Sequence, residues 1–291
     1  MGNILNKNRK NPLEKPSVGT IIGRIFEYGF MTFVFCTCVI PILWVFLSTF
    51  KTNMEVLESP FTWPAKFTLD AYKMAFETAD VGRFFLNSVI VSVCNTGLCV
   101  LIYSMAAYGL TRFTFRGKKL IVTLFATTLL IPVTSMLYPI FFVVNRLGLY
   151  DSKAGLILVY VAMGLPMSFF ILSSCFANLP KEIEKAAYID GAGIWTTFTR
   201  IMMPIAGPSL ISVAILSFFS SWNDFIFALV LTSKTANRTL PLALKYFLTK
   251  FTYNYPSLFA VVMIIVIPCI IVYAVLQNRV MEGLVAGSIK G

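Results

Sequence analysis

Long apolar stretches separated by short polar segments dominate the chain. Six of them extend for about 20 residues or more with no charge at their centres, and about 20 residues is what an α-helix needs to cross the hydrocarbon core of a bilayer. A membrane barrel would instead show short segments of alternating hydrophobicity. The pattern therefore predicts an all-α integral membrane protein with six transmembrane helices, at 28–50, 85–110, 120–144, 154–176, 203–223 and 258–277, the fifth open to extension as far as 231.

Prolines interrupt several of the predicted spans. Pro132 and Pro139 lie in the third span, Pro166 in the fourth and Pro268 in the sixth. Each removes a backbone donor and is expected to kink its helix, and the freed carbonyls need partners from neighbouring helices, side chains or water. Several interrupted helices suggest a bundle that moves, although proline is common in membrane helices in any case.

Composition agrees with the span pattern. Of the 291 residues, 57% are hydrophobic and only 13% are charged, about half of the roughly 25% that is typical of a soluble domain. The formal net charge is +11, but the Lys and Arg residues gather in short clusters between apolar stretches. That distribution follows the positive-inside rule, and no basic face interleaved with exposed aromatics points to a nucleic-acid partner.

The basic clusters orient the predicted bundle. They precede the first span and fill the turn between the second and third spans, and both groups belong in the cytoplasm; they are Lys7, Arg9, Lys10, Lys15 and Arg24, then Arg112, Arg116, Lys118 and Lys119. With six spans in the cell membrane, both terminal tails, 1–27 and 279–291, are then cytoplasmic. Residues 51–84 mix acids and bases and are predicted to fold outside, whereas the basic outer loop after the fifth span weakens the asymmetry.

The chain lacks the side chains of common catalytic and metal sites. It contains no histidine, which removes the commonest metal ligand and the commonest general base. Its six cysteines all lie in apolar runs and are interpreted as small buried hydrophobes. No glycine-rich phosphate loop ending in Gly-Lys-Ser/Thr is present. We expect a protein that is not an enzyme and that binds no metal or cofactor.

The segment between the fourth and fifth spans, 179–204, is neither a short connection nor a span. Pro180 suits the first turn of a helix, and two glutamates in that turn favour the positive end of the helix dipole. Gly191 and Gly193 are expected to break the helix. From Ile194 onward apolar residues recur at helical spacing, which predicts a second short helix in the membrane interface before the fifth span.

This loop resembles the signature loop of the membrane subunits of ABC importers. That family reads Glu-Ala-Ala, three residues, Gly, nine residues, Ile, one residue, Leu-Pro, and the same spacing is met here by Lys185-Ala186-Ala187, Gly191, Ile201 and Met203-Pro204. Two positions depart from the family: Lys185 stands for the acid, with Glu184 directly before it, and Met203 stands for leucine. The first departure leaves a salt bridge from that position in doubt.

Further stretches resemble the carbohydrate branch of this family, and specifically the second membrane subunit of maltose-type systems. They are 183–192 in the loop, 221–225 at the end of the fifth span and 282–291 at the C-terminus. The resemblance implies a type I ABC importer permease fold, with a core at 85–278 after the first span and the outer segment. It also implies a sugar or oligosaccharide as the transported solute.

The resemblance further implies that loop 179–204 is seated in a groove of a cytoplasmic ATPase subunit. The residues it assigns to this coupling are Glu184, Lys185, Ala186, Ala187, Asp190, Gly191, Ile201 and Pro204. The C-terminal residues it places at the same interface are Gly283, Leu284, Gly287, Lys290 and Gly291. The implied partners are a second homologous permease subunit, two ATPase subunits that use ATP-Mg, and an extracytoplasmic sugar-binding protein.

Polar and aromatic groups within the spans are candidates for a sugar pathway, because intramembrane polar residues are functional candidates by default. They are Asn87, Tyr103, Tyr138, Trp222, Asn223 and Asp224. Each could equally tie two helices together. Asp224 lies about 30 Å from Pro204 at 1.5 Å per helical residue, which places it at the outer interface.

Three alternatives fit the sequence less well. A secondary transporter driven by an ion gradient would show midplane carboxylates or broken helices in two repeated halves, and the centres of these spans contain no Asp or Glu. An intramembrane enzyme would need a nucleophile, base or metal that is not visible here. A scaffold without transport would leave the loop unexplained. The sequence therefore predicts a permease subunit of an ATP-driven carbohydrate importer and does not identify the sugar.

Overall fold

The computed structural model describes residues 18–248 and 253–288, and within these ranges the chain is helical, with one isolated bridge between Leu248 and Tyr253 in place of strands. Four helices are long and apolar enough to cross a membrane, and counting two bent helix pairs as one span each gives up to six. The four are α1 (Val18–Ser48), α4 (Val81–Arg112), α7 (Lys153–Asn178) and α13 (Tyr255–Ser288). The all-α membrane class is confirmed.

The third predicted span is broken at Pro132, one of the two prolines expected to interrupt it, whereas the helix runs through Pro139. α5 (Lys118–Thr128) is followed by a break, by η1 (Val133–Met136) and by α6 (Leu137–Arg146), and the chain bends by 104°. Pro132 has an extended backbone (φ −59°, ψ 125°), and a helix cannot continue through it because the residue before a proline avoids the helical region. Pro139 is tolerated because it falls in the first turn of α6.

The fifth predicted span ends where expected, but it starts later than predicted and does not extend to 231. The chain is helical from Ile194 to Ile205, bends by 80° and only then enters α11 (Gly207–Trp222). Pro204 therefore does not start the span; Pro208, in the first turn of α11, does, because it cannot continue the preceding helix. The extension to 231 is broken after Trp222, and a separate α12 (Ile226–Leu231) follows.

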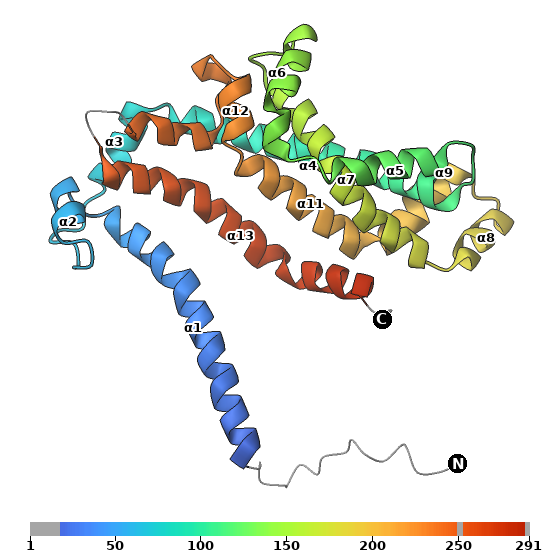
Figure 1. Ribbon diagram of the computed structural model, residues 1–291, viewed down its shortest axis with the longest axis horizontal. Coiled ribbons are helices and arrows are strands. Elements are labelled where there is room, and N and C mark those ends of the chain that lie inside the picture. Colours follow the sequence, from blue (N-terminus) through green and yellow to red (C-terminus); the bar gives the residue numbers. More distant parts are fainter. Residues whose placement is uncertain (1–17, 249–252, 289–291) are drawn as a thin grey trace.

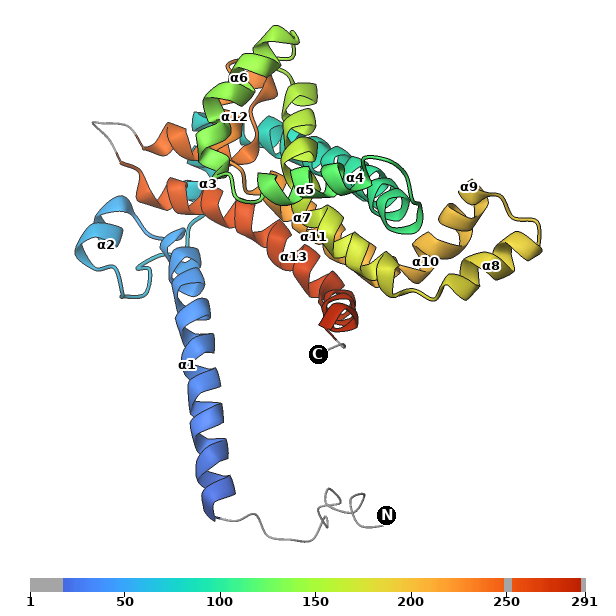
Figure 2. The same ribbon diagram turned by 45° about the vertical axis from the view of Figure 1, so that its right-hand side comes forward.

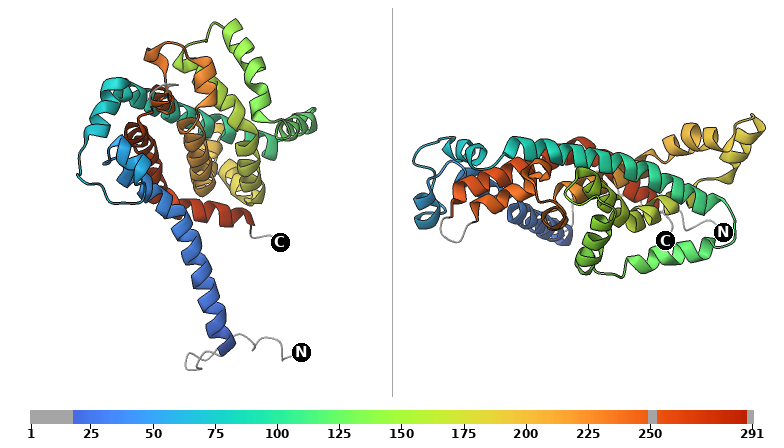
Figure 3. Two further views of the ribbon diagram at one scale, coloured as in Figure 1. Left: turned by 60° about the vertical axis from the view of Figure 1, so that its left-hand side comes forward. Right: turned by 90° about the horizontal axis from the view of Figure 1, so that it is seen from above.

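The helix α4 lies at the centre of the bundle, packed against α7 and α11, with α13 on the far side of α11 (Figures 1 and 3). Its buried face recurs at every fourth residue, as expected for one stripe of a helix; these residues are Asn87, Val91, Asn95, Cys99, Tyr103 and Ala107. The stripe mixes apolar and hydrogen-bonding groups. The contacts of α4 therefore combine close packing with directed polar bonds.

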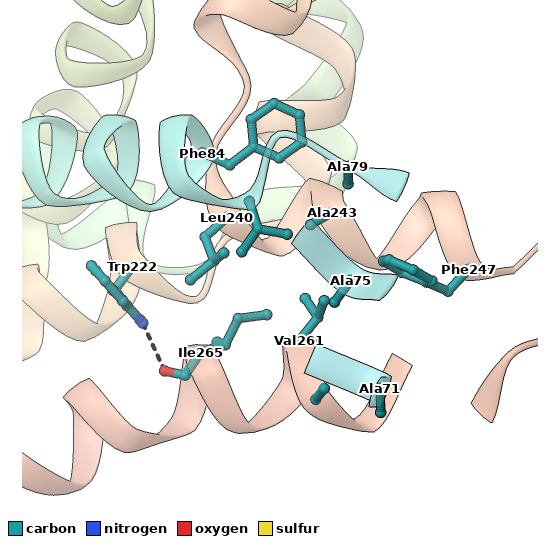
Figure 4. Packing of buried hydrophobic residues seen from close by; sticks show 12 residues of the cluster. Ala71, Ala75, Ala79, Phe84, Trp222, Leu240, Ala243, Phe247, Val261 and Ile265 are labelled. Atoms are coloured by element: carbon teal, nitrogen blue, oxygen red, sulfur yellow. Dashed lines mark hydrogen bonds between the residues drawn. The ribbon is translucent and has the colours of Figure 1, made fainter. Parts of the chain in front are cut away.

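Three long helices contain an internal proline, and in two of them, α7 and α13, a side chain from a neighbouring helix bonds a carbonyl about one turn before it. In α7, which contains Pro166, the hydroxyl of Tyr103 from α4 donates to the carbonyl of Val161. In α13, which contains Pro268, Nε1 of Trp222 from α11 donates to the carbonyl of Ile265 at 3.0 Å (Figure 4). Each bond lies one residue away from the carbonyl that the proline itself frees, at Ala162 or Ile264, and ties the helix to its neighbour beside the proline.

The first helix, α1, stands apart from the bundle and meets it only toward its C-terminal end (Figures 1 and 2). There the Trp44 ring packs on Phe259 of α13 with centroids 5.4 Å apart, and its Nε1 donates to the carbonyl of Pro60 at 2.7 Å. None of its most hydrophobic window is buried within the chain. Such a helix needs lipid or another membrane chain around it.

Short helices distinguish the two ends of the molecule. The predicted outer segment folds into α2 (Asn53–Glu58) and α3 (Asp70–Thr78), which lie at the opposite end from α8 (Lys181–Ile189) and α9 (Ile194–Thr197) (Figure 1). We call these the α2 end and the α8 end. The loop after α12 contributes η3 (Thr235–Asn237) and η4 (Leu240–Phe247), and η4 packs on α13 and α4.

A carboxylate joins two loops outside the membrane-spanning helices. Asp151, between α6 and α7, adopts a left-handed backbone (φ 55°), and its Oδ1 accepts the amide protons of Ser233 and Lys234 at 2.9 and 3.0 Å. Partial burial raises its pKa, but these two amides, the Asn237 side chain and the Lys234 charge outweigh that effect and hold the pKa below its ordinary value. The loop before α7 is thereby tied to the loop after α12.

The lowered pKa of Asp151 predicts a pH-dependent contribution to stability. The stabilisation of the folded state by ionised Asp151 is fully present above the unfolded pKa of about 3.9. It is lost as the pH falls through the lower pKa of the folded state. We expect the wild-type protein to unfold at a higher temperature than Asp151→Asn at about pH 6, with the difference shrinking as the pH falls below about 4. Thermal unfolding in detergent measures it, and a difference that stays constant with pH would contradict the assignment.

Candidate functional site

The predicted loop 179–204 is present as two short helical arms joined by a tight turn. α8 forms the first arm. The second arm comprises α9, a π turn (Phe198–Met202) and α10 (Met203–Ile205), and leads through the bend at Ala206 into α11. Figure 2 shows both arms extending beyond α7 and α11 at the α8 end. The prediction of two short helices broken at the glycines is confirmed.

The turn between the arms has the geometry of a Schellman motif. Gly191 has φ 81°, its amide donates to the carbonyl of Tyr188 at 3.1 Å, and the amide of Ala192 donates to the carbonyl of Ala187 at 2.9 Å. This pair of bonds satisfies the carbonyls left free at the end of α8. Because the left-handed region is unfavourable for residues with a Cβ, the motif explains why a glycine stands at position 191.

Glu184 lies on the face of α8 that packs against the helix bundle. Its Oε2 lies 3.1 Å from Nε of Arg112, the last residue of α4, and its Oε1 accepts the hydroxyl proton of Tyr108 at 2.8 Å. The Arg112 and Glu184 side chains are only 6% and 11% exposed. Removing one partner of such a pair leaves the other charge buried and unpaired, which costs about 3–5 kcal/mol.

Aromatic rings enclose this ion pair. The Tyr108 ring lies 5.8, 5.6 and 5.1 Å from the rings of Phe113, Phe176 and Phe198, which come from the end of α4, from α7 and from the second arm. Ala187, one turn after Glu184, is also buried, at 4% exposure. The small side chain lets α8 approach these rings closely.

The end of the loop, on either side of the glycine turn, is exposed and apolar. Ile189 is 86% exposed, and the other members are Tyr188, Ile194 and Trp195, at 44%, 55% and 59%. We call these four residues the apolar tip. Apolar side chains grouped on a projecting loop are typical of a surface that another molecule covers.

The structure divides the predicted coupling residues between the two faces. Glu184 and Ala187 point inward, Ile201 is half-buried, and the exposed members are Lys185, Ala186, Asp190, Gly191 and Pro204. None of the four residues of the apolar tip was among the predicted coupling residues. The sequence nevertheless indicates an exposed apolar surface here, because the two isoleucines and Trp195 flank the glycine turn and so short a loop cannot bury them.

The predicted C-terminal tail begins inside a helix. α13 continues past the predicted end of the sixth span at 277 and reaches Ser288, so Gly283, Leu284 and Gly287 lie in its last turns. Lys290 and Gly291 lie outside the described residues. α13 runs from the α2 end toward the α8 end (Figure 1).

Three of the predicted pathway residues have their polar atoms bonded within the chain. Asn87 donates to the carbonyls of Ala236 and Arg238, both at 2.9 Å. Tyr103 and Trp222 bond the backbones of α7 and α13 as described above, and all three side chains are buried, at 4% exposure or less. In this conformation they tie elements together and do not face a path through the chain.

The other three predicted pathway residues are more accessible. Tyr138, on α6, is 75% exposed, and Asn223 is exposed at the end of α11. Asp224 is half-buried; its Oδ2 accepts the hydroxyl proton of Tyr160 at 2.8 Å and the amide proton of Ala228 at 2.9 Å. Asp224 thus has a structural role at the start of α12, which is one reason why the fifth span ends where it does.

Grooves follow the bend between α5 and α6. Two of them, of about 340 and 270 Å³, share Met136, Ala162 and Met163 and are lined almost entirely by apolar side chains. Among the described residues, no group of three Cys, Asp or Glu side chains is placed to hold a metal ion. These two grooves are therefore apolar surfaces.

Comparisons with known proteins agree with this architecture. Residues 99–283 match the family model described as "Binding-protein-dependent transport system inner membrane component". A diacetylchitobiose uptake system permease of Streptomyces coelicolor is 37% identical over 254 residues, which cover 87% of this chain and 84% of the relative. A trehalose transport system permease of Mycobacterium tuberculosis is 33% identical over 262 residues, 89% of this chain and 95% of the relative.

A solved structure shares the fold. A chain of a bacterial ABC transporter involved in the import of the acidic polysaccharide alginate superposes with a TM-score of 0.79, covering 91% of this chain and 99% of that chain. The two sequences are 21% identical. The match confirms the predicted permease fold.

The turn at Gly191 generates a prediction with a matched control. Gly191→Ala places a Cβ in the left-handed region, which costs about 1–2 kcal/mol, and we expect faster amide hydrogen exchange across 181–192. Gly193 has φ −73° and open space around the position of a Cβ, so Gly193→Ala should leave exchange unchanged. Equal exchange in the two variants would show that the left-handed turn does not hold the loop.

Proposed function

Because the chain belongs to the family of binding-protein-dependent transport system inner membrane components, we propose that it forms half of the translocation pathway of an ATP-driven carbohydrate importer. It is a multi-pass membrane protein and a sugar ABC transporter permease by its family. Relatives named for the uptake of diacetylchitobiose and trehalose support a short oligosaccharide as the solute. The other half of the pathway comes from a second homologous permease subunit, for which the apolar grooves along α7 and the exposed α1 offer surface.

The loop of α8 and α9 couples this chain to a cytoplasmic ATPase subunit. The observation that carries the proposal is the apolar tip, which extends beyond the bundle with Ile189 almost fully exposed. An anchor of this kind is stable in water only when a partner groove covers it. The exposed Lys185 and Asp190 border the tip and fit a polar rim around such a contact.

Orientation follows from the charges at the same end. Arg116 and Lys119 are exposed in the turn between α4 and α5, beside Arg112 and Lys118, and such clusters face the cytoplasm. The α8 end is then cytoplasmic, together with both termini. The α2 end faces outward, toward an extracytoplasmic sugar-binding protein.

The chain itself supplies no ATP site in this proposal. ATP-Mg is bound and hydrolysed by two ATPase subunits, and the end of α13, with Gly283, Leu284 and Gly287, lies toward the same interface. The solute passes between the two permeases, and Tyr138, Asn223 and Asp224 are the predicted pathway residues that remain accessible in this chain.

The apolar tip provides the test of the coupling role. Ile189→Asp should weaken binding of the ATPase subunit by at least about tenfold, because an interface anchor contributes about 2 kcal/mol or more. Phe61→Asp is the matched control, since Phe61 is 89% exposed at the α2 end. Co-purification of the ATPase subunit with each variant measures the effect. Undiminished binding by Ile189→Asp, or equal losses in both variants, would contradict the proposal.

The solute and the energy source are tested together by reconstitution. Proteoliposomes that hold the full assembly and its binding protein should take up diacetylchitobiose or trehalose only when ATP is supplied to the ATPase side. An imposed proton or sodium gradient without ATP should give no uptake. Uptake driven by the gradient alone would identify a secondary transporter instead.

A further inference from the structure

We propose that Arg112 is a positioning residue that transmits movement of the loop to the membrane bundle. This inference rests on the proposed coupling to an ATPase, and it assigns to the inward face of α8 a role different from that of the apolar tip. The tip receives the partner, and Arg112 links the loop to α4. The residues concerned are Arg112, Glu184 and Tyr108.

Arg112 joins three elements at one point. It ends α4, its Nε lies 3.1 Å from Oε2 of Glu184 on α8, and its Nη2 donates to the carbonyl of Leu179, which ends α7, at 2.8 Å. Tyr108, one turn earlier on α4, donates to the other oxygen of Glu184 at 2.8 Å. Two side chains of α4 therefore hold one carboxylate of α8 from both oxygens.

This link is difficult to open. Its charges are almost excluded from water, and three phenylalanine rings surround Tyr108, so water cannot easily replace either partner. Among the side chains that the structure describes, the other ion pair, Arg83 with Asp80, is exposed. Arg112 and Glu184 thus form the one buried ion pair in the part of the chain that the structure describes, and they lie at the base of the loop.

The second arm is attached differently. It is held by the apolar side chains of Phe198 and Met202, both at 2% exposure or less, and meets α11 through the 80° bend at Ala206. Packed apolar surfaces resist separation but do not fix direction as the hydrogen bonds of Tyr108 to Glu184 and of Arg112 to Leu179 do. The α8 arm is therefore the rigid connection, and the α9 arm is where the loop can change angle.

The experiment compares solute transported per ATP hydrolysed in the reconstituted assembly. Arg112→Ala should lower this ratio by about tenfold, within the roughly 5–150-fold range of ordinary coupling free energies, while the ATPase subunit remains bound. Arg112→Lys retains the charge and should recover part of the ratio. Tyr108→Phe removes one bond to Glu184 and should give a smaller loss.

Arg116→Ala is the matched control, because Arg116 is exposed in the next turn of the chain; its ratio should equal that of the wild-type protein. A wild-type ratio in Arg112→Ala would overturn the inference. If Arg112→Ala does not assemble, Arg112→Lys and Tyr108→Phe provide the test. Wild-type ratios of solute transported per ATP hydrolysed in both variants would overturn the inference. Loss of ATPase binding from Ile189→Asp alone concerns the apolar tip, so failure of the proposed function is distinguished from failure of this inference.

Discussion

A bilayer interior contains no water to bond a free backbone carbonyl or amide, and this constraint organises the bundle. Helices satisfy most of these groups, but Pro166 and Pro268 each interrupt a long helix. Close to each proline a side chain from a neighbouring helix bonds the backbone: Tyr103 bonds Val161 and Trp222 bonds Ile265. Asn95 of α4 likewise donates to the carbonyl of Ser217 on α11 at 3.0 Å. These three polar side chains within the spans therefore hold neighbouring helices together.

The same constraint explains which predictions from the sequence succeeded. Long apolar runs and the glycine turn at 191 are local properties, and they located the four long helices, the two bent helix pairs and the two-armed loop. The sequence did not place the bend between α5 and α6 or the start of α11, because both depend on which of several prolines stops a helix. Pro132 and Pro139 differ only in their position relative to a helix end. Tyr103 and Trp222 were candidates for a pathway because a sequence shows a polar group but not the carbonyl that accepts its proton.

The loop illustrates a second limit. The spacing of the motif placed Glu184, Ala187 and Lys185 in one helix, but it did not assign them to faces. Adjacent residues of a helix point about 100° apart, so Glu184 reaches Arg112 while Lys185 is exposed. The charge at the end of α4 was interpreted as a topology signal alone. Its partner, 72 positions later in the chain, became visible only when α4, α7 and α8 were brought together.

The bonds of α4 decide how this bundle can move. From one end of the helix to the other, Asn87 bonds the loop after α12, Asn95 bonds α11, Tyr103 bonds α7 and Arg112 holds α8. Sliding α4 along α7, α8 or α11 would break at least one of these bonds, and no water replaces those of Asn95 and Tyr103 within the bilayer. Movement of the loop should therefore carry α4, α7 and α11 as one body. The changes of angle fall where the helices are already broken, at 129–132 and at Ala206, because an interrupted helix has no continuous hydrogen-bond ladder to lose.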